Sequence, residues 1–206
     1  FRKLGKWWNV LSYRIGYLLI SALVLGSMLV GLSGCNITDF SAENLLRPPK
    51  AVGDEAEIEQ LIAKTADSGY TLKYPKNGKF RSAIIMTDLD GNDSNEAVAF
   101  FRNSAETSSV HMLVMYSKDN SWEIASDNIF ETTDIDSVDF ADLTGNGKAE
   151  IIVNSTTYTP NVGKLSCYSY SEGKTNEVDS GQSCSSFVTG DFDNDGTNEI
   201  MSLVLY

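Results

Sequence analysis

The 206-residue sequence is poor in the side chains on which many active sites and metal clusters depend, with three cysteines and one histidine. Three cysteines are too few for a zinc cluster, and a single histidine gives little support for catalysis by a histidine base. Basic residues are also scarce, because 16 lysines and arginines stand against 28 aspartates and glutamates, a formal net charge of −12. This charge repels phosphate backbones, so we expect no nucleic-acid partner.

The first 35 residues differ from the rest of the chain. They hold four of the basic residues and no acidic one, and residues 17–32 form an uncharged, mostly apolar run. A basic start, an apolar run and the small residues Ser33 and Gly34 before Cys35 are the pattern of a secretory signal. From Asn36 onward the chain has 12 basic and 28 acidic side chains, a formal net charge of −16.

The segment Leu32-Ser33-Gly34-Cys35 resembles the lipobox of bacterial lipoproteins. This resemblance implies that residues 1–35 are a lipoprotein signal peptide and that the Cys35 sulfur carries a diacylglycerol. Two acyl chains suffice for stable anchoring, so the chain would be held by lipid on the extracytoplasmic face of the bacterial membrane. The alternative is an uncleaved membrane anchor in which Cys35 has no role, because the apolar run approaches the ~20 residues of a spanning helix.

A tether and a short helix are expected to follow the signal. Residues 36–53 contain two consecutive prolines and scattered polar side chains, which favours an extended linker. Residues 54–79 should hold one helix and a lead-in strand, and Asp54 with Glu57 predicts a capping box at the start of the helix. We expect the helix to cover an open sheet edge, and an interaction helix on the membrane side is the alternative.

A nine-residue acidic pattern occurs three times, at 88–96, 142–150 and 191–199. Each copy lies between two strand-like stretches, and further alternating runs raise the count to roughly four short strands per period of about fifty residues. This period is typical of a β-propeller blade. The predicted fold is therefore mainly β, with residues 80–206 forming a partial propeller of about three four-stranded blades. A closed propeller needs about four to eight blades, which favours a chain truncated at its C-terminus.

The loops and their flanking strands resemble the FG-GAP or VCBS-type repeats of calcium-bearing β-propellers, found in integrin heads and bacterial surface proteins. The third copy has the full D-x-D-x-D-G-x-x-E pattern. The first copy departs from the pattern at Asp93, which replaces a glycine, and the second departs at Thr144, which replaces an acid. We expect a positive φ at position 6, which Gly147 and Gly196 tolerate.

Positions 1, 3, 5 and 9 of such a loop bring oxygen atoms to one centre, and hard oxygen donors suit Ca²⁺. The expected calcium ligands are Asp88, Asp90, Asn92 and Glu96; Asp142, Thr144, Asn146 and Glu150; and Asp191, Asp193, Asp195 and Glu199. Carboxylate number tunes affinity, so the third loop should bind most tightly and the second most weakly. An EF-hand would need an acid at position 12, where the copies have Ala99, Val153 and Ser202. Acidic turns without an ion are the other alternative, above all for the second loop.

Few residues outside the acidic loops are candidates for a disulfide, a catalytic group or a ligand contact. Cys167 and Cys184 either form a disulfide outside the cytoplasm or are small buried hydrophobic residues. His111 is expected to have a packing or surface role. The aromatic side chains Trp122, Tyr158, Tyr168 and Tyr170 are expected in the core, and a sugar-stacking surface is the alternative.

These features predict a lipid-anchored lipoprotein whose calcium-stabilised, propeller-like domain binds an extracellular protein or glycan without intrinsic catalysis. The alternative is a cell-surface carbohydrate-active enzyme or its carbohydrate-binding accessory, since propellers host such sites and paired carboxylates can act as acid and base. That alternative requires an acidic pair outside the repeated loops.

Overall fold

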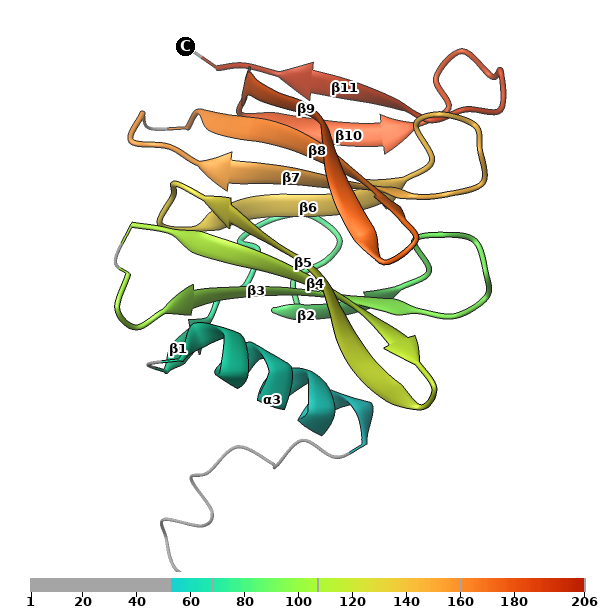
Figure 1. Cartoon of the computed structure of the whole chain (residues 1–206). Coiled ribbons are helices and arrows are strands. Elements are labelled where there is room, and N and C mark those ends of the chain that lie inside the picture. The colour runs from blue at the N-terminus through green and yellow to red at the C-terminus, as the bar shows by residue number, and fades with distance from the viewer. Residues whose placement is uncertain (1–52, 68, 107, 160, 206) are drawn as a thin grey trace, which may run out of the picture. The chain divides into compact units, whose positions relative to one another are not determined.

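The computed structural model describes residues 53–67, 69–106, 108–159 and 161–205. The predicted signal, Cys35 and most of the tether lie outside these residues. The elements within them are α3 (Asp54–Ala66), β1 (Tyr70–Leu72), β2 (Ile84–Thr87), β3 (Glu96–Asn103), β4 (Val110–Lys118), β5 (Ser121–Phe130), β6 (Ile135–Ala141), β7 (Glu150–Thr156), β8 (Gly163–Ser171), β9 (Lys174–Cys184), β10 (Ser186–Gly190) and β11 (Glu199–Leu203) (Figure 1). The mainly β fold is confirmed. Within the described ranges, no helix has the length and hydropathy needed to span a membrane.

The strands form three antiparallel sheets that follow one another along the chain. In sheet 1, β3, β4 and β5 pair in order, and β1 and β2 both pair with β3. Sheet 2 has the order β6-β7-β8-β9, and sheet 3 is the hairpin β10-β11. The predicted unit of four strands is therefore present twice, as β2–β5 and β6–β9, and its first two strands recur in sheet 3.

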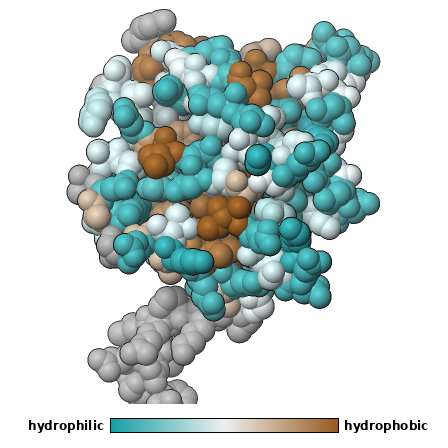
Figure 2. Space-filling model, viewed as in Figure 1, coloured by the Kyte–Doolittle hydropathy of each residue, from teal (hydrophilic) through white to brown (hydrophobic). Residues whose placement is uncertain are grey.

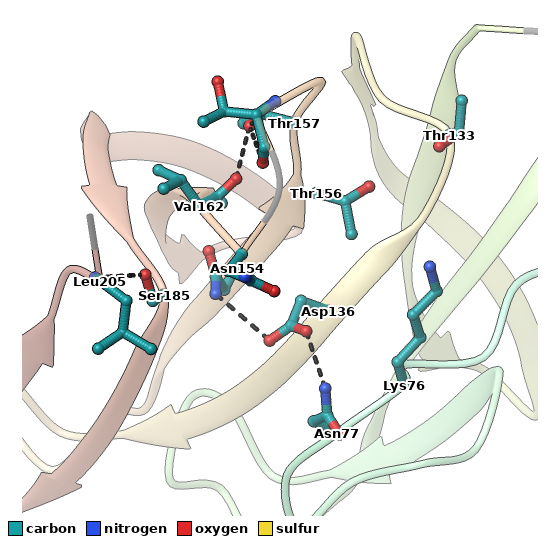
Figure 3. Close-up of a pocket in the computed structure, with 13 residues that line it drawn as sticks. Lys76, Asn77, Thr133, Asp136, Asn154, Thr156, Thr157, Val162, Ser185 and Leu205 are labelled. Atoms are coloured by element: carbon teal, nitrogen blue, oxygen red, sulfur yellow. Dashed lines mark hydrogen bonds between the residues drawn. The ribbon is translucent and has the colours of Figure 1, made fainter.

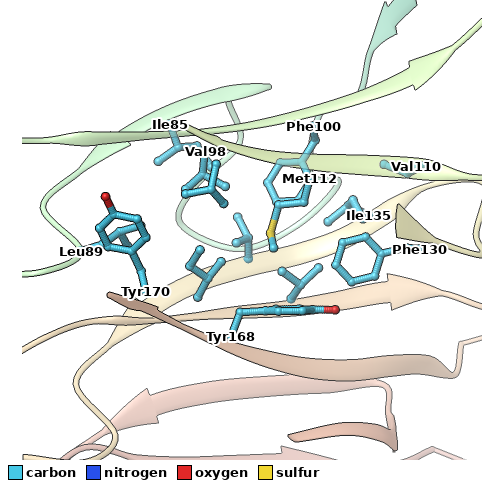
Figure 4. Close-up of a cluster of buried hydrophobic side chains, with 14 residues drawn as sticks. Ile85, Leu89, Val98, Phe100, Val110, Met112, Phe130, Ile135, Tyr168 and Tyr170 are labelled. Carbon is cyan, nitrogen blue, oxygen red and sulfur yellow. The ribbon is translucent and has the colours of Figure 1, made fainter. Parts of the chain in front are cut away.

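The largest core lies between sheets 1 and 2 (Figure 4). Alternation along β4 sends Met112 toward sheet 2 and the next residue, Leu113, toward the opposite face of sheet 1. Met112 packs with Phe100, and sheet 2 contributes Ile151 and Tyr168 to the same cluster. Side chains from two inner faces thus interdigitate as in other stacked sheets.

Helix α3 covers the other face of sheet 1. Its buried residues Ile58 and Ile62 pack in one cluster with Phe101, Leu113 and Trp122. The expectation that the helix covers a sheet edge is wrong, because its apolar stripe needs the wider surface of a sheet face.

The helix also begins differently from the expectation. The N-cap is Gly53, with φ of 64°, and no side chain caps the first turn. The Glu57 carboxylate does not close a capping box: its Oε1 accepts a hydrogen bond of 3.0 Å from the backbone N–H of Trp122 in β5. Glu57 therefore ties the helix to the sheet.

Sheet 3 packs on the outer face of sheet 2, where Phe187 and Ile200 meet Ile152 and Leu165. The order of layers is α3, sheet 1, sheet 2 and sheet 3 (Figure 1). The described residues form no closed barrel or propeller, and α3 occupies the face of sheet 1 on which a closing blade would pack. Antiparallel sheets are thus present, and their assembly into a propeller stays a prediction.

The two cysteines of this unit are free and buried. Cys184 pairs with Gly163, and Cys167 lies four residues further along β8, or about 13 Å at ~3.3 Å per residue. A disulfide requires Cα atoms within about 7 Å, so the possible Cys167–Cys184 bridge is not formed. Both side chains instead pack in the small core between sheets 2 and 3, and burial raises the pKa of the Cys167 thiol to about 11.

Candidate metal centres in three acidic loops

The three acidic repeats join the first two strands of each sheet. Loop 1 (88–96) links β2 to β3, loop 2 (142–150) links β6 to β7, and loop 3 (191–199) links β10 to β11. The loops lie above one another at the same end of the three sheets (Figure 1). The strand–loop–strand unit predicted from the sequence is confirmed in each copy.

The first aspartate of each loop organises the backbone that follows it. In loop 2, Asp142 Oδ1 accepts hydrogen bonds from the backbone N–H groups of Thr144, Gly145 and Asn146 at 3.2, 2.8 and 3.2 Å, and its Oδ2 accepts one from Gly147 at 2.7 Å. Asp88 accepts from the amides three, four and five residues further on, at 2.8, 3.2 and 2.9 Å. Asp191 accepts from the last two of these positions, at 3.1 and 3.0 Å.

These bonds also favour the charged form of the carboxylates. Partial burial raises the pKa of the Asp88 and Asp142 carboxyls, but the backbone N–H donors outweigh it and hold each pKa below its usual range. Both side chains therefore stay ionised around neutral pH, as metal ligands must.

Two further bonds recur in all three loops. The glutamate at position 9 accepts a hydrogen bond through Oε2 from the backbone N–H at position 2, at 2.8 Å each time, in the pairs Glu96–Leu89, Glu150–Leu143 and Glu199–Phe192. The side chain at position 5 accepts one from the backbone N–H at position 7, at 2.7, 2.8 and 2.8 Å, in the pairs Asn92–Ser94, Asn146–Lys148 and Asp195–Thr197. The three loops thus share one conformation despite different side chains.

Two positions in each loop have a positive φ. Position 6 has φ of 65°, 80° and 93° at Asp93, Gly147 and Gly196, which confirms the expectation for the two glycines. Position 4 also has a positive φ, at Gly91, Gly145 and Asn194. The positive φ at position 4 was not predicted from the sequence, although glycine and asparagine are the residues that tolerate this conformation best.

Loops 1 and 3 each bring several carboxylates together. One oxygen from each of Asp191, Asp193, Asp195 and Glu199 lies within 4.8 Å of the others, and Asp88, Asp90 and Glu96 form a similar group. Such groups of oxygen atoms could hold a metal ion. Loop 2 offers only two carboxylates, from Asp142 and Glu150, with the neutral Thr144 and Asn146 at positions 3 and 5.

Loop 1 also has buried carboxylate oxygens whose mutual repulsion and lack of partners a bound cation would relieve. Asp90 Oδ1 is buried and has no hydrogen-bond partner, and Glu96 is only 3% exposed. Burial raises the pKa of the Glu96 carboxyl, and the charges of Asp90 and Asp88 raise it further, against the hydrogen bond from Leu89. A buried carboxylate beside two others is costly without a counter-charge, so the donor set of loop 1 fits a divalent cation.

Neighbouring loops are hydrogen-bonded to each other. The Ala149 N–H of loop 2 donates to the Leu89 carbonyl of loop 1 at 3.0 Å, and the Asn198 N–H of loop 3 donates to the Asp142 carbonyl of loop 2 at 3.0 Å. A Cβ on Gly91 would lie 2.6 Å from the Gly147 carbonyl oxygen, so the contact between loops 1 and 2 depends on glycine. The loops therefore form one continuous row, a feature that no single repeat reveals.

A second polar cluster surrounds His111 on β4. Its Nδ1 lies 2.9 and 3.0 Å from the two carboxylate oxygens of Asp127 on β5, and its Nε2 lies 3.2 Å from Glu106. His111 is 6% exposed, and its ring stacks on that of Phe101 with 4.8 Å between centroids. The contact with Asp127 was not predicted from the sequence, because Asp127 is a diagonal neighbour on the adjacent strand.

Three of the four aromatic side chains lie in the core as expected, and the expectation is wrong for Tyr158. Trp122, Tyr168 and Tyr170 are at most 6% exposed and belong to the hydrophobic clusters. Tyr158, between β7 and β8, is 92% exposed. Three of the four residues are therefore excluded from a sugar-stacking surface.

Comparison of the chain with protein-family models, with curated proteins and with solved structures finds no match. The resemblance to FG-GAP or VCBS-type repeats therefore stays a resemblance of motif. The structure adds a loop conformation repeated three times, with carboxylate groups in two of the copies.

Proposed function

We propose that this protein is a lipid-anchored, extracytoplasmic bacterial protein whose stacked sheets form a calcium-stabilised binding module without catalytic activity. The observation that supports this most strongly is the threefold loop, in which the same backbone hydrogen bonds present four carboxylates in loop 3 and three in loop 1. The blade-like sheets would belong to a propeller, open or completed by further blades.

Calcium is the cation that suits these donors best. All the side-chain ligands offered are oxygens, from carboxylates, two amides and a hydroxyl, and Ca²⁺ accepts six to eight oxygen donors in irregular arrangements. Mg²⁺ demands a near-ideal octahedron and keeps several waters, which a loop with many closely placed carboxylates does not favour. Extracellular calcium modules bind at about 10⁻⁴ to 10⁻³ M, and we expect loop 3 to bind more tightly than loop 1 and loop 2 most weakly.

The ion would act on the arrangement of strands. Calcium neutralises carboxylates that otherwise repel each other, and each loop joins the first two strands of its sheet. Because the loops are hydrogen-bonded in a row, ordering of one loop also favours order in the next. The module would therefore offer fixed surfaces to a partner when calcium is present.

Charged groups outside the loops support a binding role over an enzymatic one. Asp127 and Glu106 are both engaged by His111, and Asp134 pairs with Lys73 at 2.8 Å and with Lys76 at 3.2 Å. Carboxylates held in this way are poorly placed to act as the acid and base of a glycosidase. The view in Figure 2 is mainly hydrophilic with separate apolar patches, which suits a protein exposed to solvent.

Thermal melting of the full chain in detergent, with calcium and with chelator, tests the calcium proposal. At calcium concentrations about a hundredfold above Kd, binding should stabilise the fold by about 2.7 kcal/mol. Replacing Asp191 and Asp193 together by Asn should remove most of this gain. The control replaces the exposed Asp119 and Asp179 by Asn, which removes the same charge outside the loops. Equal midpoints with calcium and with chelator would contradict the proposal.

Lipid attachment is tested separately. Cells expressing the chain are labelled with a clickable palmitate analogue, and the Cys35→Ser variant is the control. Label on the native chain and none on the variant is expected. Label on both, or on neither, would remove the lipid anchor from the proposal.

A further inference from the structure

A polar cavity of about 480 Å³ lies at the end of sheet 2 opposite to the acidic loops (Figure 3). Its walls come from the segment between β1 and β2, the start of β6, the end of β7 and the loop between β7 and β8. The volume is in the range of sites for small ligands. Hydroxyl and amide side chains dominate the lining, with Val162 and Leu205 as its apolar members.

Asn154 of β7 lines this cavity and is 1% exposed. Its Nδ2 donates a long hydrogen bond of 3.4 Å to Asp136 Oδ2, and its Oδ1 has no hydrogen-bond partner. A buried acceptor without a donor destabilises the fold relative to an apolar side chain of the same shape. Asn154 therefore lowers the stability of the fold, because no described residue donates a hydrogen bond to its Oδ1.

A β-bulge places Asp136 beside Asn154. Ile135 pairs with Ser155 and Ser137 pairs with Asn154, so Asp136 is the extra residue in β6. Bulges redirect side chains and are common beside binding sites. The Asp136 carboxylate points toward Asn154 and also accepts a hydrogen bond of 2.9 Å from Asn77 Nδ2 (Figure 3).

Gly163 of β8 makes room for the Asn154 side chain. A Cβ at this position would lie 2.3 Å from Asn154 Oδ1 and 2.7 Å from the Ser155 carbonyl oxygen. The glycine is therefore needed for close approach of the amide. A bulge, a glycine and a buried unpaired acceptor meet at one side of the same cavity.

The charges around the cavity indicate a neutral ligand. Lys76 and Asp136 line it, and Lys76 pairs with Asp134, which also binds Lys73. Two lysines and two aspartates leave no net charge to select an anion or a cation. Hydroxyls and amides, which both donate and accept, match the hydroxyl groups of a sugar, whereas peptide recognition relies on apolar pockets or open strand edges.

We propose that this cavity binds a neutral saccharide. A sugar hydroxyl donates to Asn154 Oδ1 when the amide turns about χ2 away from Gly163, while Asp136 and Asn77 bind neighbouring hydroxyls. The inference rests on the proposed role of the domain as an exported binding module, and it names the ligand class of that module. It does not depend on calcium.

Calorimetric titration of the full chain, in a detergent without a sugar headgroup, tests this site. The probes are glucose, galactose, mannose and N-acetylglucosamine, each up to about 10 mM, a concentration that would nearly saturate a site with a Kd of about 1 mM. Glucose 6-phosphate and glucosamine are the charged comparisons. Saturable binding of at least one neutral sugar, tighter than its charged analogue, is expected. Absence of binding by all four, or tighter binding of a charged analogue, would overturn the inference.

Two variants connect binding to the cavity. Asn154→Val should weaken binding roughly tenfold or more, because it removes the unpaired acceptor, and should leave the melting temperature unchanged or higher. The matched control is Asn128→Val in β5, since Asn128 bonds to Ser126 and Thr175 and does not line the cavity. The exposed Asn77→Ala provides a second test if Asn154→Val does not fold, and should weaken binding severalfold. Unchanged affinity in the variants would overturn the assignment.

The same titration is repeated after calcium removal, which separates this inference from the calcium proposal. A chain that binds sugar but gains no stability from calcium refutes the calcium proposal alone. A chain that is stabilised by calcium but binds no sugar refutes the saccharide site alone.

Discussion

Loops 2 and 3 have the same backbone conformation but differ in their number of carboxylates and in their hydrogen bonds to neighbouring loops. Loop 2 has two carboxylates and hydrogen bonds to a neighbouring loop on each side. Loop 3 has four carboxylates, of which those of Asp191, Asp193 and Asp195 are exposed, and hydrogen bonds to loop 2 alone. The loop that packs between others thus has little charge, and the loop at the end of the row has the most.

This difference separates the shape of the loop from its ability to bind a cation. The shape depends on the aspartate at position 1 and the glutamate at position 9, which all three copies share. The number of carboxylates that could hold a cation depends on positions 3 and 5, where loop 2 has Thr144 and Asn146 and loop 3 has Asp193 and Asp195. The two properties should therefore be separable by mutation.

The largest effect is expected from giving loop 2 the carboxylates of loop 3. Thr144→Asp combined with Asn146→Asp should convert loop 2, which is expected to bind calcium most weakly, into a tight site, because the backbone already has the required conformation. At calcium concentrations about a hundredfold above its Kd, the new site should add about 2.7 kcal/mol of stability. Calorimetry should show one more ion bound per chain.

Thr144→Asn is the control for this variant, because it changes the side chain at position 3 without adding charge. In chelator the double variant should be less stable than the native chain, since four carboxylates then repel each other. If the double variant binds no additional ion, loop conformation and carboxylate number together are insufficient for a site.

A smaller effect should distinguish the close contact between loops 1 and 2 from the open surroundings of Gly196 in loop 3. Gly91→Ala combines a positive φ of 74° with a Cβ placed 2.6 Å from the Gly147 carbonyl oxygen, so it should cost about 2 kcal/mol. Gly196→Ala in loop 3 has a φ of 93° but no atom within 4 Å of the added Cβ, and should cost about 1 kcal/mol. Urea unfolding in chelator measures both. Equal losses would show that contact between loops 1 and 2 contributes no stability.

The local features of this fold could be predicted from the sequence. The acidic loops, their flanking strands and the alternation of Met112 and Leu113 depend on residues close together in the chain, where spacing determines which face a side chain takes. The position of α3 could not be predicted, because the choice between an edge and a face depends on which surface of sheet 1 the other sheets leave open. Closure into a propeller could not be predicted either, since the length of a repeat does not determine how many blades assemble.

In the acidic loops too, local features could be predicted from the sequence and contacts between distant segments could not. The ligand positions 1, 3, 5 and 9 follow from the motif, and the structure brings together the carboxylates at positions 1, 3 and 9 in loop 1 and at all four positions in loop 3. The hydrogen bond between Ala149 and Leu89 joins residues sixty positions apart and leaves no local pattern. The bulge at Asp136 is likewise a property of two paired strands, so the polar cavity appears only in the folded chain.

The smallest effect concerns pH and distinguishes the buried glutamate of loop 1 from the more exposed Glu199 of loop 3. Because burial raises the pKa of Glu96, the metal-free fold takes up a proton at a higher pH than the unfolded chain. This contribution stabilises the metal-free protein at low pH and is lost as pH rises through the raised pKa. Calcium requires the deprotonated form, so affinity at loop 1 should fall severalfold between pH 7 and pH 5, while the lowered pKa of Asp88 keeps that ligand charged.

Calorimetry at pH 7, 6 and 5 measures this effect in a chain whose loop 3 is disabled by Asp191→Asn with Asp193→Asn. Glu96→Gln in the same background is the control. It should bind calcium more weakly but with a flatter pH dependence, because the group that exchanges a proton for the ion is gone. An affinity at loop 1 that does not change over this range would mean that Glu96 is not a calcium ligand, and the difference between the loops would then depend on positions 3 and 5 alone.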